Sequence, residues 1–215
     1  MAQVFPRWIN QLPFAIAAAL PIVGLVVVCS VWYWFSPKFT DVGYQPEQPI
    51  PFSHSLHAGD MEMDCRYCHN TVEVAAHAAV PPTQTCMNCH VTVAPESDVL
   101  APVRAAYATD EPMEWVRVHM LPDYAYFNHS VHVAAGVGCT SCHGRIDEMA
   151  VVYQHEPLSM GWCLDCHRDP EPNLRPLSEV TNMAYEPEAA GYDHSADPAR
   201  ERELVPPQHC GGCHR

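Results

Sequence analysis

Five segments of the chain carry the pattern Cys-x-x-Cys-His, and their side chains are the ones best suited to chemistry. The motifs are Cys65, Cys68 and His69; Cys86, Cys89 and His90; Cys139, Cys142 and His143; Cys163, Cys166 and His167; and Cys210, Cys213 and His214. Residues three apart share one side of a helical turn, so two thiols can form thioether bonds to the two vinyl groups of one haem. The adjacent His then supplies the proximal nitrogen to the iron. The pattern therefore predicts five covalently bound haem c groups.

Two other uses of cysteine fit the pattern poorly. A zinc site needs two Cys pairs that converge on one ion, whereas here every pair is followed by its own His. Ten of the 11 Cys lie in these pairs, which is not the spacing of a disulfide framework. The remaining one, Cys29, lies in an apolar segment, where we interpret it as a small membrane-embedded residue.

The sixth ligand decides whether a haem iron only passes electrons or binds a substrate. Nine of the 14 His lie outside the motifs, so distal ligands are plentiful. The strongest candidates form two His-x-x-His pairs, His54 with His57 and His129 with His132. This spacing resembles that of the small class III multihaem cytochromes, which implies that His54 caps the first haem and His129 the third. By the same resemblance, His57 and His132 reach other haems.

Further candidates leave the ligands of the second, fourth and fifth haems open. His77 lies between the first two motifs and is a candidate distal ligand. His119 is a candidate either for a distal ligand or for a proton-carrying group near a quinone. His155 and Met160 precede the fourth motif and are weaker candidates, and a Met ligand there would raise the potential of its haem.

An internal repeat organises the motifs. Phe52, His54, Ser55 and His57 recur 75 residues later as Phe127, His129, Ser130 and His132. In each copy one haem motif follows closely and a second follows after that. The repeat predicts that residues 50–90 and 125–167 are two copies of a two-haem unit.

The N-terminal segment predicts a membrane anchor. Residues 13–35 contain no formal charge and are long enough to cross a bilayer as a helix. Trp8 and Trp32–Trp34 flank this segment at the positions of interfacial aromatics. No small-residue cleavage site follows, so we expect an anchor rather than a removed signal peptide. Because bacteria attach haem to such motifs outside the cytoplasmic membrane, we expect a single pass with residues 36–215 on the periplasmic side.

Composition limits the fold of the rest of the chain. Residues 36–215 contain only 30 Leu, Ile, Val and Phe, too few for an ordinary core, so porphyrins must fill the interior. The 21 Pro and 10 Gly favour a mostly α-helical and irregular domain, with short helices at the motifs and one over 99–107. The formal net charge of −14 excludes a nucleic-acid binder. The predicted parts are a cytoplasmic N-terminus (1–11), a transmembrane anchor (12–35), a linker (36–49), the first two-haem unit (50–90), a connector (91–124), the second unit (125–167) and a Pro-rich tail with the fifth haem (168–215).

Several phrases of the sequence resemble one family. Residues 49–59, 86–90, 118–144 and 157–168 resemble the pentahaem cytochrome subunit of bacterial alternative complex III, a quinol:electron acceptor oxidoreductase. The resemblance implies an electron-transfer subunit without catalysis of its own. It implies as partners sibling membrane subunits, an iron–sulfur subunit and a monohaem cytochrome c subunit, with the quinol pool reached indirectly. The electrons would leave towards a cytochrome c or another periplasmic acceptor.

Two other functions remain as alternatives. The chain could be a stand-alone membrane quinol dehydrogenase cytochrome that feeds a periplasmic reductase. A catalytic multihaem reductase fits less well, because such enzymes typically mark the catalytic haem with an unusual proximal residue such as Lys. All five motifs end in His, and the only Lys is Lys38.

Overall fold

The computed structural model describes residues 4–197 and 204–214. It divides into two compact units, 1–41 and 42–215. The predicted cytoplasmic N-terminus and Pro-rich tail therefore include positions (1–3, 198–203 and 215) that lie outside the described residues.

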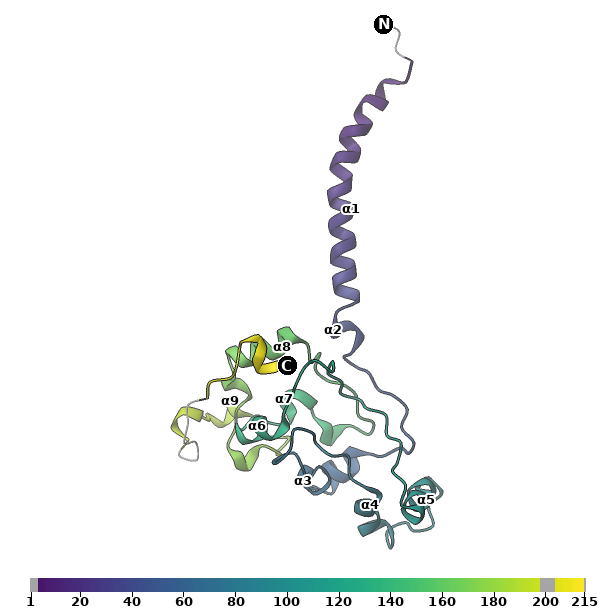
Figure 1. Cartoon of the computed structure of the whole chain (residues 1–215), viewed down its shortest axis with the longest axis vertical. Helices are drawn as coiled ribbons and strands as arrows, with labels where there is room; N and C mark the ends of the chain where they lie inside the picture. The colour runs from purple at the N-terminus through teal and green to yellow at the C-terminus, as the bar shows by residue number, and fades with distance from the viewer. Residues whose placement is uncertain (1–3, 198–203, 215) are drawn as a thin grey trace. The chain divides into compact units, whose positions relative to one another are not determined.

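The first unit is dominated by one apolar helix. Helix α1 spans Leu12–Trp34, after a 3-10 turn at Arg7–Gln11, and the short helix α2 spans Pro37–Thr40 (Figure 1). Pro13 lies in the first turn of α1, where a missing N–H costs nothing. Its 23 residues give a length of about 34 Å, which exceeds the hydrocarbon thickness of a bilayer, about 30 Å.

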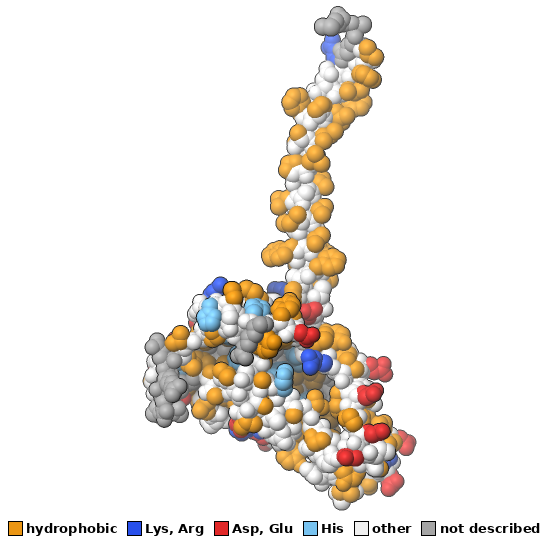
Figure 2. Space-filling model, viewed as in Figure 1, with side chains coloured by type: hydrophobic (Ala, Val, Ile, Leu, Met, Phe, Trp, Pro, Cys, Tyr) orange, Lys and Arg blue, Asp and Glu red, His pale blue; other side chains and the backbone are white. Residues whose placement is uncertain are grey.

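The surface of α1 suits lipid on all sides. Hydrophobic side chains cover it along its whole length, and none of its residues is buried (Figure 2). The mean hydropathy of its most apolar window is 2.6, and it is the one helix among the described residues that could span a membrane by length and composition. The helix agrees to within one residue with the predicted segment 12–35 and fits a single-pass anchor. A signal sequence has the same composition, so the fate of this helix in the mature protein is a testable point.

The second unit consists of short helices joined by irregular chain (Figure 1). The α-helices are α3 (Cys65–Cys68), α4 (Thr83–His90), α5 (Ala101–Thr109), α6 (His129–Ala134), α7 (Thr140–His143), α8 (Met160–Arg168), α9 (Pro187–Ala190) and α10 (Cys210–Cys213). A π-helical turn spans Ser55–Asp60, and 3-10 turns span Asp98–Leu100, Ile146–Glu148, Glu171–Asn173, Leu177–Glu179 and His194–Ala196. Among the described residues there is no strand, only two isolated β-bridges.

The helices begin where the sequence can cap them. Each of the five haem motifs lies on a short helix, as predicted, and α5 covers most of the predicted segment 99–107. Asp64, Asn128 and Ser159 accept hydrogen bonds from the backbone N–H groups that open α3, α6 and α8. Local side chains therefore define the starts of three of the helices that carry motif or ligand residues.

The interior of the second unit contains little apolar material. Within the described part of the chain, the buried hydrophobic side chains are Ile50, Val103, Met149, Leu174 and Val180. Proteins of this size normally bury many more side chains of this kind. So sparse a core agrees with the prediction that groups other than side chains fill the interior of this unit.

A buried arginine occupies part of the remaining interior. Arg175 is 3% exposed and donates hydrogen bonds to the Asn182 carbonyl (2.9 Å) and to the Thr140 hydroxyl (2.8 Å). Its guanidinium lies 5.6 Å from the centre of the Tyr185 ring. It packs so closely on Gly138 that no Cβ fits there. Arg175 thus fastens the chain after the fourth motif to helix α7.

We predict that α1 stays in the mature protein and holds it in the membrane. The protein extracted from membranes should retain residues 12–34 by intact mass and should resist alkaline carbonate. Val23→Arg places a charge at the helix centre, which costs about 3 kcal/mol of insertion free energy, so the variant should be lost from the membrane fraction. Thr40→Arg lies outside the helix and should behave as wild type. A mature chain that lacks these residues would contradict the prediction.

We predict that Asp64 stabilises the first motif through its cap. Its carboxylate accepts from Arg66 N and from the Arg66 guanidinium, both at 2.8 Å, and from the Thr181 hydroxyl at 2.9 Å. Asp64→Ala should lower the free energy of unfolding by about 1 kcal/mol, whereas Asp64→Asn should keep the cap and lose only the charge.

The charge of Asp64 gives this effect a pH dependence. The hydrogen bonds from Arg66, opposed by partial burial, lower the pKa of Asp64 to about 2. The stabilisation by the charge is therefore complete above the unfolded pKa of about 3.9 and disappears as pH falls towards 2. Thermal unfolding of wild type and Asp64→Asn should differ at pH 7 and converge at low pH. Equal stability of Asp64→Ala and wild type at pH 7 would refute the cap.

Candidate functional site

Four of the five motif histidines are oriented by backbone carbonyls. In each, Nδ1 lies within hydrogen-bond distance of a carbonyl oxygen: His69 with Ala79 (2.8 Å), His90 with Val93 (3.0 Å), His167 with Pro207 (2.7 Å) and His214 with Tyr124 (2.9 Å). A carbonyl only accepts, so Nδ1 carries the proton and donates it. The neutral ring then leaves Nε2 unprotonated, which is the form that binds a metal.

The fifth motif histidine has a different partner. His143 Nδ1 lies 3.3 Å from Nε2 of His119, and the two rings meet edge to face with centroids 4.4 Å apart. Burial, followed by the nearby His119 and His129, lowers the pKa of His143 to about 3. Burial is also the main reason that the pKa of His119 falls to about 4. Both rings are therefore neutral at physiological pH.

Three candidate distal histidines face motif histidines at a spacing that suits an iron. The ring centroids are separated by 6.2 Å for His57 and His90, by 6.1 Å for His132 and His167, and by 6.4 Å for His129 and His143. Imidazole nitrogens bind metal ions at about 2 Å, so two rings on opposite sides of one ion have centroids about 6 Å apart. The donor set and its spacing therefore fit bis-histidine haem iron.

The distal rings are held by the same device as the proximal ones. Nδ1 of each faces a backbone carbonyl: His57 faces Ser53 (2.8 Å), His132 faces Asn128 (2.8 Å) and His129 faces Ala76 (2.9 Å). Phe52 stacks on His57 with centroids 4.5 Å apart, and Phe127 packs on His132 at 4.4 Å. The second histidines of the two His-x-x-His segments, His57 and His132, thus have nearly the same surroundings.

His54 lies in a buried position beside the first motif. Its pKa is lowered to about 4, mainly by burial and then by the neighbouring charges of His69 and His57. Its Nδ1 is buried without a hydrogen-bond partner among the described residues. The role of distal ligand to the first haem, which the resemblance to class III cytochromes implies for His54, stays a prediction.

The two repeats exchange equivalent contacts. Ser55 N donates to the Met149 carbonyl (3.0 Å), and Ser130 N donates to the Ala75 carbonyl (3.2 Å). Ser55 and Ser130 are matching positions of the repeat, as are Ala75 and Met149. The thiols of Cys65 and Cys139, the first cysteine of each copy, also lie near each other, and this neighbour together with burial raises the pKa of Cys139. Such an exchange is what an approximate two-fold axis between the copies produces.

The cysteine sulfurs record which motifs are neighbours. Burial is the main reason that the pKa values of Cys68, Cys142 and Cys163 are raised. The second reason in each case is a nearby thiol: Cys86 raises the pKa of Cys68, Cys166 that of Cys142, and Cys213 that of Cys163. These three pairs of neighbouring thiols relate the first motif to the second, the third to the fourth, and the fourth to the fifth. Together with the contact of Cys65 and Cys139, they arrange the motifs in the order second, first, third, fourth, fifth.

The other sequence candidates lie elsewhere. His77 is exposed, and Met160 is exposed on helix α8. His155 is exposed as well and rests its ring against Gly144, next to His143. The ring of Tyr124 lies beside that of His214, at 5.8 Å between centroids, and among the described residues no close pair of His214 with another histidine ring is found. The distal ligand of the fifth haem therefore stays an open prediction.

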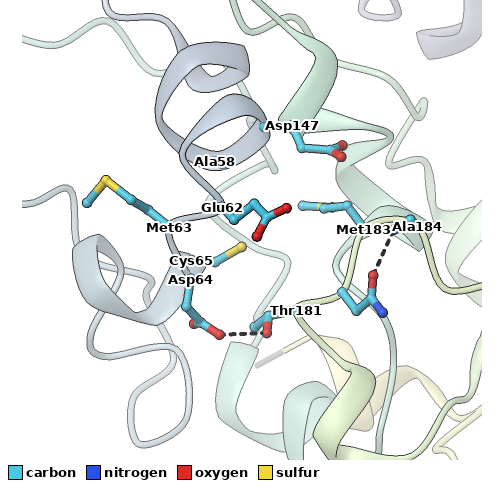
Figure 3. A pocket seen from close by; sticks show the side chains of 11 residues that line it. Ala58, Glu62, Met63, Asp64, Cys65, Asp147, Thr181, Met183 and Ala184 are labelled. Atoms are coloured by element: carbon cyan, nitrogen blue, oxygen red, sulfur yellow. Dashed lines mark hydrogen bonds between the residues drawn. The ribbon is translucent and has the colours of Figure 1, made fainter.

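A cavity of about 400 Å³ borders the first motif. Figure 3 shows the Glu62 carboxylate and the Met183 side chain reaching into it beside the Cys65 sulfur. Asp64 and Asp147 add two more carboxyl groups to its lining. So acidic a lining disfavours anions, including haem propionates, and we assign no ligand to it.

Sequence reasoning found the histidines but missed what holds and pairs them. The pairing of His57 with His90 and of His132 with His167 depends on chain folding that no local spacing reports. The carbonyls that orient the histidines belong to the backbone, so no residue type in the sequence marks them. The recurrence of Phe52 as Phe127 was the one visible sign that the two His-x-x-His segments share a geometry.

Comparison with known proteins gives one relative for the site. The chain is 34% identical over 122 residues to the multiheme cytochrome c subunit of menaquinone reductase from Nitratidesulfovibrio vulgaris (strain Hildenborough). The match covers 56% of this chain and 56% of the relative, so the chain spans about half the length of the relative it matches. No family model matches the sequence.

We predict that His57 and His132 each cap one haem of their own repeat. His57→Ala and His132→Ala should each convert one low-spin haem of five to a high-spin, carbon monoxide-binding form, because each opens one side of one iron. All five covalent haems should remain, since the attachment residues are intact. Electron paramagnetic resonance and pyridine haemochrome spectra measure the two quantities.

A control on the same helix separates ligation from local damage. Val131 is 60% exposed between His129 and His132, and Val131→Ala should leave all haems low-spin. Unchanged spectra in both His variants would show that these rings are not ligands.

Proposed function

We propose that the chain is a membrane-anchored multihaem cytochrome c that passes electrons within a quinone-linked oxidoreductase complex. Five attachment motifs, the paired histidines and the similarity to a multiheme subunit of a menaquinone reductase support this function. Bound haem supplies an iron that alternates between ferric and ferrous states and so carries one electron at a time. The protein itself binds, orients and spaces the groups.

The observation that carries the proposal is the pairing of motif histidines with candidate distal histidines. A histidine faces the motif histidine in the second, third and fourth motifs, and His54 is positioned to do the same in the first. An iron held on both sides has no position left for a substrate. The pairing at these motifs supports the proposal of an electron carrier without catalysis of its own.

The order of the motifs gives the carrier two ends. Neighbouring cysteines join the motifs in the order second, first, third, fourth, fifth. At one end, Cys89 of the second motif is exposed, and at the other, Cys210 of the fifth is exposed. We assign these two ends to electron entry and exit.

A duplicated two-haem unit accounts for the internal repeat. Each copy would provide a His-x-x-His segment and two motifs, and the second histidine of each segment would cap the second haem of its own copy. The equal spacings of His57 to His90 and of His132 to His167 support this assignment. The fifth motif would then be an addition at the C-terminal end.

The complex that fits best is alternative complex III. The sequence phrases that resemble its pentahaem subunit support this, as does an apolar helix suited to a single-pass anchor. In this complex the haem unit would lie on the periplasmic side of the cytoplasmic membrane. Its partners would be the sibling membrane subunits, the iron–sulfur subunit and the monohaem cytochrome c subunit, and electrons would pass from quinol oxidation to a periplasmic acceptor.

A second candidate reverses the direction of electron flow. The relative belongs to a menaquinone reductase, and that name favours a complex in which the cytochrome receives electrons and a partner delivers them to quinone. The carrier function of this chain would be the same in both directions.

The test is isolation of the tagged chain from detergent-solubilised host membranes. We expect co-purification with an iron–sulfur subunit and integral membrane subunits, and haem reduction by a quinol that is lost when those subunits are stripped away. Reduction of the haems by quinol in the isolated chain would instead indicate a stand-alone quinol dehydrogenase. A high-spin, ligand-accessible haem in the intact preparation would indicate a catalytic reductase. Reduction of quinone by a reduced cytochrome would support the reverse direction.

A further inference from the structure

The first and third motifs are matching positions of the repeat, yet their histidines have different hydrogen-bond acceptors. His69 Nδ1 donates to the carbonyl of Ala79 at 2.8 Å. His143 Nδ1 lies instead 3.3 Å from the side-chain nitrogen Nε2 of His119. The other three motif histidines all use backbone carbonyls. His143 is thus the one motif histidine that depends on another side chain.

The direction of this hydrogen bond follows from the chemistry of the ligand. To bind iron through an unprotonated Nε2, His143 would carry its proton on Nδ1, and Nδ1 would be the donor. His119 is then the acceptor and carries its own proton on Nδ1. The contact uses the ring nitrogen of His143 that iron does not use. His119 therefore cannot be the sixth ligand of the same iron.

His119 is held in place by the connector segment. Gln48 clamps the backbone of Val116 through two hydrogen bonds, with Nε2 donating to the Val116 carbonyl and Oε1 accepting from Val116 N, both at 2.9 Å. Val116 lies three residues before His119. The imidazole itself is only partly exposed and meets the His143 ring at an interplanar angle of 78°. The hydrogen bonds of Gln48 thus hold the connector so that Nε2 of His119 faces His143.

We propose that His119 is a positioning residue that accepts the hydrogen bond of His143 and thereby sets the reduction potential of the third haem apart from that of the first. The proposal rests on haem attachment at the third motif, which is part of the proposed function. A hydrogen-bond acceptor behind a ligating histidine fixes its orientation and increases its basicity. A more basic ligand favours ferric over ferrous iron, so the acceptor keeps the potential low.

The consequence lies at the centre of the motif order. The third motif stands between the first and the fourth. Two copies with identical surroundings would hold their first haems at the same potential. The different acceptors, Ala79 and His119, break this equality at the point where the two repeats meet.

The test measures the five midpoint potentials of the purified holoprotein. His119→Leu removes the acceptor, and one midpoint should shift upwards while the other four stay in place. His119→Gln keeps an oxygen that can accept, so it should restore most of the wild-type value. Met120 is a 51% exposed neighbour, and Met120→Ala should leave all five midpoints unchanged.

A double variant identifies which haem has shifted. His129→Met marks the third haem, because a Met ligand raises the potential, and the shift caused by His119→Leu must fall on the same haem. Five unmoved midpoints, or a shift at another haem, would overturn the proposal. Conversion of one haem to a high-spin form by His119→Leu would also overturn it, because this result identifies a distal ligand. Absence of covalent haem from the wild-type protein would instead refute the proposed function, and a haemochrome assay separates the two failures.

Discussion

The arrangement of the second unit depends on a choice between the two nitrogens of each imidazole. A histidine that donates Nδ1–H to the backbone leaves Nε2 for a metal, and seven described histidines have Nδ1 next to a carbonyl oxygen. Carbonyls inside a helix are already engaged, so free acceptors must come from irregular chain. Ala79, Val93 and Pro207 lie in such chain. The loops that proline imposes on this sequence therefore supply the acceptors that orient the ligands.

The same constraint explains why the core is so poor in apolar side chains. Irregular chain that turns its carbonyls towards imidazoles cannot present a continuous hydrophobic face. The few buried apolar residues, such as Val103 and Leu174, lie beside buried polar ones such as Gln154 and Arg175. These polar side chains have backbone partners: the Gln154 side-chain amide donates to the Glu156 carbonyl, and the Arg175 guanidinium donates to the Asn182 carbonyl. On the proposed function, porphyrin would supply the apolar volume that the chain lacks.

The sequence could predict the features that depend on adjacent residues, but not the contacts between residues far apart in the chain. The motif spacing predicted short helices at all five motifs, and the uninterrupted apolar run predicted α1, because both are properties of adjacent residues. The facing of His57 and His90 could not be predicted, since 32 residues, including helix α3 and most of α4, separate them and their approach is decided by folding. The contact of His119 with His143 was missed for the same reason.

On the proposed duplication, the linear order of the motifs follows from where the two copies touch. They meet through their first cysteines, Cys65 and Cys139, and through the reciprocal bonds of Ser55 and Ser130. Contact at the first motif of each copy places the second motif of each copy on the outside. An extra motif next to Cys163 then lengthens one side only, which makes the two ends different. The C-terminal addition and the His119 contact therefore make the two halves of the carrier different, while the direction of electron flow would be set by the potentials of its donor and acceptor.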